Sequence, residues 1–109
     1  MEPKTTHRAD VRPIQIAAGS YRRTLGWGEH TLLSEVTLDR DGIVPRHAHP
    51  HEQIGYVVRG ALQFTIGDRV VVLVPGDGYV IPGGTPHSVL ALEDSLAVDV
   101  FSPLREEYK

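Results

Sequence analysis

Short segments of apolar and β-branched residues, each closed by a turn signal, run through most of the chain. In residues 61–66 every second residue is apolar, and residues 69–74 are almost all valine or leucine. The Gly67-Asp68 pair between them suits a two-residue hairpin turn. No stretch of about ten residues shows a helical period. The pattern predicts about nine or ten short strands, and therefore an all-β sandwich or barrel.

The expected strands follow one another along the chain, and the sequence contains no internal repeat and no linker between domains. Residues 1–10 are polar and are expected to form an N-terminal arm, and residues 11–109 a single domain of ordinary size. A turn is expected at residues 26–28. The expected strands cover residues 11–17, 21–25, 29–38, 43–47, 53–59, 61–66, 69–74, 79–81, 87–92 and 95–102.

Charge and hydropathy exclude several classes of function. The net charge of −3 provides no basic surface for nucleic acid. The longest apolar run, residues 70–74, is far too short to cross a bilayer, and the first ten residues lack the apolar core of a signal peptide. The absence of cysteine removes thiol chemistry. We expect a cytoplasmic protein with no nucleic-acid or membrane partner.

Histidines gather in two short segments of the sequence. His47 and His49 are separated by one residue, so on a strand they share a face with their Cα atoms roughly 6–7 Å apart. Two imidazoles at that separation can bind one metal ion. The segment 82–87 is a turn rich in proline and glycine that ends in His87. The alternative is a polar loop in which histidines cluster without a metal.

With both segments in place, the chain resembles the cupin family. The resemblance implies a double-stranded β-helix, also called a jelly-roll barrel, that holds one divalent metal ion, either Ni, Zn, Mn or Fe. Gln53 stands where many cupins have glutamate. The two motifs that carry the resemblance are Gly42, His47, His49, Gln53 and Gly60, and then Gly76, Pro82, Gly84 and His87.

A narrower resemblance joins the segment His-Ala-His-Pro-His-Glu-Gln at residues 47–53 to the C-terminal residues 99–108. Together they look like the pectin-degradation cupins of the KdgF type, which linearise 4,5-unsaturated uronate monomers released by pectate and alginate lyases. The resemblance implies three histidines and one glutamine as metal ligands, and an Asp, a Phe and an Arg as catalytic residues. On this chain the ligands are His47, His49, Gln53 and His87, and the catalytic residues are Asp99, Phe101 and Arg105.

The fourth ligand has alternatives among its neighbours. Gln53 shares the inward parity of His49, whereas Glu52 points away. His51 has the same parity, but Pro50 bends the chain between them. A shell of three histidines and one amide is neutral, so it leaves the charge of a bound metal ion uncompensated and favours an anionic ligand.

The C-terminal residues could also have structural roles in place of catalytic ones. An aspartate within an apolar strand, such as Asp99, must be paired, hydrogen-bonded or functional. Phe101 shares its face and could be core packing, while Arg105 could be a solvated charge or the planar partner of a substrate carboxylate. Three aromatic residues that could stack on a sugar are left unassigned: Tyr21, Trp27 and Tyr79.

Three functions of different classes fit these residues. The first is linearisation of an unsaturated uronate, with an anionic sugar as substrate. The second is a non-catalytic cupin that binds a small anion or sugar, and the third a metal-dependent dioxygenase or decarboxylase. Two strands are apolar on the faces away from the site and need a cover, either from another sheet of the same chain or from a partner. The resemblance to cupins implies a partner, so a homodimer is also expected. These faces carry Ile54, Tyr56 and Val58, and Leu96, Val98 and Val100.

Overall fold

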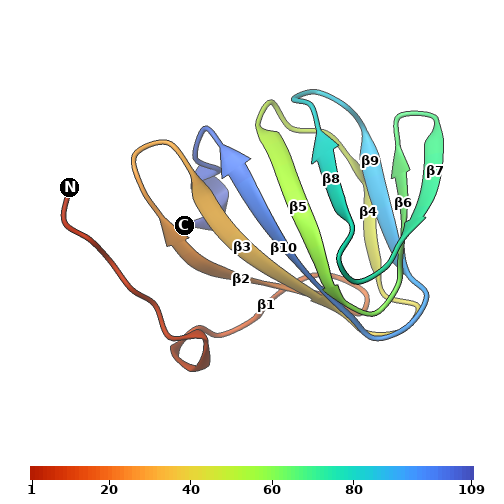
Figure 1. The fold of residues 1–109 in the computed structure, drawn as a ribbon, viewed down its shortest axis with the longest axis horizontal. Coiled ribbons are helices and arrows are strands. Elements are labelled where there is room, and N and C mark those ends of the chain that lie inside the picture. The colour runs from red at the N-terminus through yellow and green to blue at the C-terminus, as the bar shows by residue number, and fades with distance from the viewer.

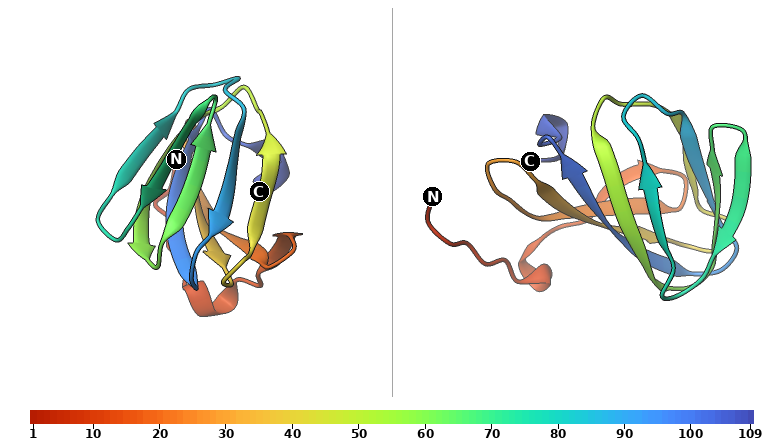
Figure 2. Two further views of the ribbon diagram at one scale, coloured as in Figure 1. Left: turned by 90° about the vertical axis from the view of Figure 1, so that its right-hand side faces the viewer. Right: turned by 45° about the horizontal axis from the view of Figure 1, so that its top comes forward.

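The computed structural model describes residues 1–109 and consists of two antiparallel sheets that face each other (Figures 1 and 2). The six-stranded sheet contains, in spatial order, β1 (Ile14–Ala17), β2 (Ser20–Trp27), β3 (Leu32–Leu38), β10 (Ser95–Ser102), β5 (Glu52–Arg59) and β8 (Gly78–Ile81). The four-stranded sheet contains β4 (Ile43–His47), β9 (His87–Ala91), β6 (Leu62–Ile66) and β7 (Arg69–Leu73). The two helices, η1 (Arg8–Asp10) and η2 (Glu106–Tyr108), are short 3-10 turns. No helix is long and apolar enough to cross a membrane.

The all-β prediction is confirmed, and each of the ten observed strands overlaps an expected segment. The ends agree within two residues except that β1 and β3 each begin three residues later than expected. The turn expected at residues 26–28 is wrong, because β2 continues through Gly26 and Trp27. These residues pair with Leu33 and Leu32 of β3, and a bulge after Thr24 accommodates the glycine inside the strand.

The apolar core lies at one end of the two sheets. In Figure 1 the strands converge at the bottom, where connecting loops close the structure, and fan apart toward the top. Most core residues come from the half of their strand near the closed end, whereas Ile81 is the last residue of β8 and pairs with Gln53 toward the open end. The core contains Leu38, Val57, Leu62, Phe64, Tyr79, Ile81, Ala91 and Ala97.

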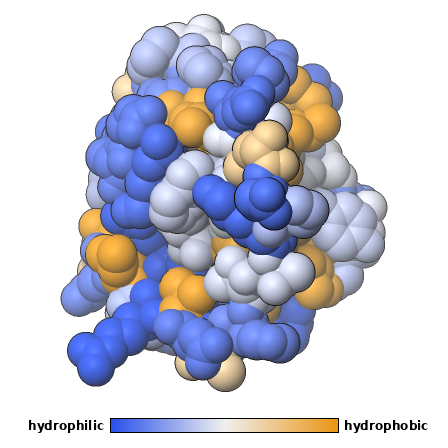
Figure 3. Space-filling model, turned by 90° about the vertical axis from the view of Figure 1, so that its left-hand side faces the viewer, coloured by the Kyte–Doolittle hydropathy of each residue, from blue (hydrophilic) through white to orange (hydrophobic).

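The N-terminal arm is tied to the outer face of the six-stranded sheet by an ion pair. Nε of Arg8 donates to both carboxylate oxygens of Glu35, at 2.8 and 3.0 Å. Arg23 from β2 lies 3.5 Å from the same carboxylate. Glu35 faces outward from β3 and is nevertheless buried. On the side of the molecule where the arm lies, the surface is mainly hydrophilic with separate apolar patches (Figure 3).

Candidate metal centre and adjoining cavity

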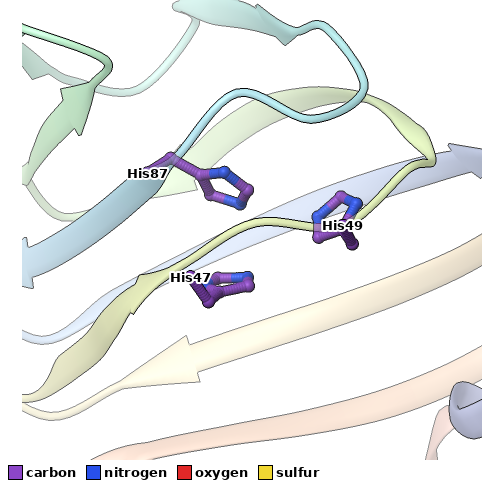
Figure 4. Close-up of side chains that lie close together, drawn as sticks. All are labelled: His47, His49 and His87. Atoms are coloured by element: carbon purple, nitrogen blue, oxygen red, sulfur yellow. The ribbon is translucent and has the colours of Figure 1, made fainter.

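Three histidine side chains converge at the open end of the sheets (Figure 4). One potential ligand atom from each of His47, His49 and His87 lies within 4.8 Å of those of the other two. His47 ends β4 and His87 begins β9, and the two residues are direct partners in the sheet. Their ring centroids are 4.3 Å apart. This grouping can hold a metal ion.

His49 reaches the cluster from a loop, so the strand face that the spacing of His47 and His49 suggested they share is wrong, while the expected end of the strand at His47 is confirmed. Strand β4 ends at His47, and β5 begins only at Glu52. The loop is held against the turn before β9, because the backbone NH of Gly84 donates to the His49 carbonyl at 2.8 Å. Gly83 has no room for a Cβ, which would overlap the Pro50 carbonyl. Packing of this loop against the turn before β9, and not strand parity, therefore brings His49 next to His47.

Backbone carbonyls orient all three imidazoles in the same way. Nδ1 lies 2.8 Å from the Pro45 oxygen in His47, 3.1 Å from the His51 oxygen in His49 and 2.8 Å from the Thr85 oxygen in His87. A carbonyl oxygen can only accept, so each Nδ1 carries the hydrogen and each Nε2 keeps its lone pair. Nε2 of His87 is buried without a partner. The three Nε2 lone pairs face inward, and that of His87 has no protein partner, so the arrangement fits a bound metal ion.

Gln53 is the fourth polar side chain at the cluster. Its Oε1 lies 3.2 Å from Nε2 of His49, so two lone pairs face each other across that distance unless a cation lies between them. Glu52 is exposed on the other side of β5. The ring of His51 is 5.4 Å from that of His49, but His51 is not among the converging histidines. Of the alternatives, Gln53 is the side chain that the structure places against the cluster.

The surroundings of His49 and His87 favour the neutral imidazole, which is the form that binds a metal. Burial, together with the positive charge of Arg105 and the neighbouring His87, lowers the pKa of His49 to about 4. Burial also lowers the pKa of His87, against the opposing effect of its hydrogen bond to Thr85. At His49 protons therefore compete with a metal ion only under acidic conditions.

Asp99 is buried close to the cluster, on the inward face of β10. Its side chain is 5% exposed, and the Tyr79 hydroxyl donates to its Oδ1 at 2.6 Å. Burial raises the pKa of Asp99, and hydrogen bonds from Tyr79 and Gln53 oppose the rise in part. The residue patterns left Tyr79 unassigned. Its signal in the sequence is Gly55, an isolated glycine in the middle of a strand, which often marks the close approach of another group.

Arg105 is held over the same cavity by aromatic rings and one acidic residue. Its guanidinium lies 4.0 Å from the ring centroid of Tyr108 and 5.1 Å from that of Phe101. Nε donates to Glu107 at 3.0 Å. Phe101 is buried and packs edge-to-face against His49, with ring centroids 5.6 Å apart. The side chain of Arg105 is only 11% exposed, so it faces the cavity more than solvent.

The cavity has a narrow inner part and a wider outer part. The inner part has a volume of about 40 Å³, enough for about one water molecule, and is bordered by Gln53, His87 and Asp99. The outer part is about 310 Å³, and His47, Arg105 and Tyr108 border both parts. The outer volume suits a small ligand.

The largest hollow of the surface lies elsewhere. It measures about 410 Å³ and lies between the N-terminal arm and Trp27. No histidine or buried acid borders it, so we place the chemistry at the smaller cavity. Lys4 and Lys109 lie 5.7 and 5.9 Å from the Trp27 ring centroid, and both termini pack there. Trp27 is therefore not part of the candidate site.

The chain belongs to the cupin family. The family model of the cupin domain matches residues 34–102, which contain all four candidate ligands. The resemblance seen in the sequence motifs is thus confirmed, and the two facing antiparallel sheets are the fold of this family. No curated protein gives a significant match.

Within the family, the chain is similar to KdgF from Halomonas sp. The solved structure of that protein shares 32% sequence identity, with a TM-score of 0.92 over 99% of this chain and 100% of that chain. An RmlC-like cupin from Shewanella frigidimarina NCIMB 400 is 25% identical, with a TM-score of 0.91 over 99% and 97% of the chains. The polyketide cyclase RemF from Streptomyces resistomycificus is 26% identical, with a TM-score of 0.80 over 94% and 80%.

Proposed function

We propose that this cupin linearises 4,5-unsaturated uronate monomers derived from pectin or alginate. The observation that carries the proposal is the position of Asp99, a buried carboxyl group bordering the same narrow cavity as His87 and Gln53. The tautomerisation of an enol requires proton transfer, and Asp99 is a proton-transfer group beside the histidine cluster. The similarity to KdgF along the whole chain supports this choice among cupin functions.

The reaction is an isomerisation in which no atom is lost. Opening of the cyclic hemiacetal breaks the bond between C1 and the ring oxygen, which leaves an aldehyde at C1 and an enol at C5. The enol becomes a ketone when C4 gains a proton and the enol hydroxyl loses one. In the proposed mechanism the protonated Asp99 gives its proton to C4 and then accepts the hydroxyl proton. The raised pKa of Asp99 favours the protonated form that this step needs.

Arg105 would anchor the substrate carboxylate in the outer part of the cavity. Its guanidinium is fixed by Tyr108 and Glu107, so little side-chain freedom is lost when it binds an anion. A divalent ion held by His47, His49, His87 and Gln53 would supply electrostatic stabilisation for negative charge that develops on the substrate oxygen. The outer volume of about 310 Å³ is of the size expected for a small-molecule site.

A non-catalytic binder of small anions would use the same cluster and the same arginine, but it has no need of a buried acid. We therefore expect turnover.

The decisive measurement is proton NMR of unsaturated galacturonate, and of its counterpart from alginate, with metal-loaded protein. Signals of the ring C4 proton should be replaced by those of the linear keto form faster than in buffer with free metal. No acceleration with either sugar would favour the binder, and release of carbon dioxide or uptake of oxygen would favour a decarboxylase or dioxygenase.

We also propose that two copies associate through the outer face of the six-stranded sheet. Four aliphatic residues lie in one lateral row across neighbouring strands, and Ile54 and Val80 in it are 51% and 56% exposed. The apolar outer face of β5 lies between Glu52 at one end of the strand and Arg59 at the other. A two-fold axis that sets two β5 strands antiparallel brings the acid of one copy to the base of the other. The row consists of Leu33, Val100, Ile54 and Val80.

Replacing Tyr56 with aspartate should convert the dimer into a monomer. Tyr56 projects from the middle of the apolar face and is 49% exposed, so the change puts two charges into the contact without disturbing the core. Light scattering should give about twice the chain mass of 12.0 kDa for the parent and the single mass for the variant. Val72→Asp, an equally exposed valine on β7, should remain dimeric. A parent protein of 12.0 kDa at micromolar concentration would rule the association out.

A further inference from the structure

Three residues on adjacent strands form a row that crosses the floor of the cavity. Gly55 of β5 is the direct partner of Asp99 in β10 on one side and of Tyr79 in β8 on the other. Residues directly opposite each other in a sheet project from the same face. All three therefore face inward, with the glycine in the centre. The outer strands of this row are about 10 Å apart, which is two strand spacings.

The missing side chain at Gly55 allows the tyrosine to reach the aspartate. A Cβ on Gly55 would overlap Cζ, Cε2 and the hydroxyl oxygen of Tyr79, so the phenol ring lies directly over the glycine. The hydroxyl then donates to Oδ1 of Asp99 at 2.6 Å across the central strand. Phe64 from the facing sheet supports the ring, with centroids 4.4 Å apart.

We propose that Tyr79 is a positioning residue that fixes the Asp99 carboxyl group for proton transfer, and that Gly55 exists at its position to admit the phenol. The inference rests on the proposed uronate linearisation. Tyr79 occupies one carboxyl oxygen, so the other oxygen is left for Gln53 and the substrate. The tyrosine holds a hydrogen bond and transfers no proton in the reaction.

Two features of the surroundings support a positioning role. Burial and the adjacent Asp99 raise the pKa of Tyr79 well above its ordinary value of 10, so the phenol keeps its hydrogen as a donor. Tyr79 is 7% exposed and does not border the outer part of the cavity, where Arg105 lies. Its loss should therefore change the chemical step and leave substrate binding intact.

Tyr79→Phe keeps the ring and removes only the donor. We expect kcat to fall roughly 10- to 100-fold, because small misplacements of a catalytic group have effects of this size. KM and metal content should stay at the parent values. Gly55→Ala should produce a similar loss although the hydroxyl is still present, and the double variant should be no slower than the slower single one. Tyr21→Phe is the matched control, since this tyrosine lies on β2 outside the cavity, and its kcat should equal that of the parent.

A second readout does not depend on turnover. In proton NMR a hydroxyl that donates to a buried carboxyl group should give a downfield, slowly exchanging signal. That signal should vanish in Tyr79→Phe and move in Asp99→Asn. Parent-like kcat in Tyr79→Phe, or a fall in kcat with an equal fall in metal content, would overturn the proposal. If the parent protein itself turns over no uronate, the proposed function fails, and the NMR signal alone decides: its movement in Asp99→Asn supports the positioning of Asp99 by Tyr79, and its absence from the parent refutes it.

Discussion

Asp99→Asn should slow uronate linearisation by roughly 10²- to 10⁴-fold, the range that general acid–base groups contribute. Asparagine keeps the shape of the side chain and still accepts the hydrogen bond from Tyr79, but it cannot exchange a proton with C4 of the substrate. The rate is measured by NMR as the appearance of the linear keto product. Metal content should be unchanged, because Asp99 lies outside the histidine cluster.

Arg105→Ala provides the contrast to this variant. A group that anchors the substrate carboxylate acts in the bound ground state as well as in the transition state, so its loss should raise KM more than it lowers kcat. Asp99→Asn should show the reverse, with kcat as the affected parameter. An Asp99→Asn protein that works as fast as the parent would make Asp99 a structural residue and remove the acid–base mechanism.

His87→Ala should lose metal binding. The Nε2 atom of His87 is buried without a protein partner, so the position serves a ligand more than the packing of the fold. A ligand that binds only the folded state at about a hundredfold excess over its Kd stabilises a protein by about 2.7 kcal/mol. For a domain of this size that corresponds to a rise in Tm of roughly 10 °C or more. The parent should show this rise with a divalent metal, and His87→Ala should not.

Two further variants calibrate the metal experiment. Gln53→Ala should weaken the thermal shift less than His87→Ala, because three imidazoles remain. His30→Ala removes a histidine that is 87% exposed in the loop between β2 and β3, and it should behave like the parent. Elemental analysis that finds equal metal in His87→Ala and in the parent would contradict the assignment of the cluster.

The class of fold and the two motifs that contain the candidate histidine ligands could be predicted from the residues alone. Alternating apolar residues interrupted by turn residues define strands because side chains on a strand point to opposite faces with a fixed period of two. The same period correctly predicts that Asp99 and Phe101 face inward while Ile54, Tyr56 and Val58 face outward. These properties are local, so they need no knowledge of what each strand packs against.

What only the tertiary structure decided depends on contacts between distant segments. His49 belongs to the cluster because Gly83 and Gly84 pack against its loop, more than thirty residues along the chain, and strand parity could not reveal this. Glu35 is buried on an outward face because the N-terminal arm brings Arg8 to it. Tyr79 reaches Asp99 only because β5 lies between their strands and has a glycine there. The order of strands in a sheet is set by the packing of the whole chain, so a hydrogen bond from β8 to β10 across β5 is absent from any local pattern.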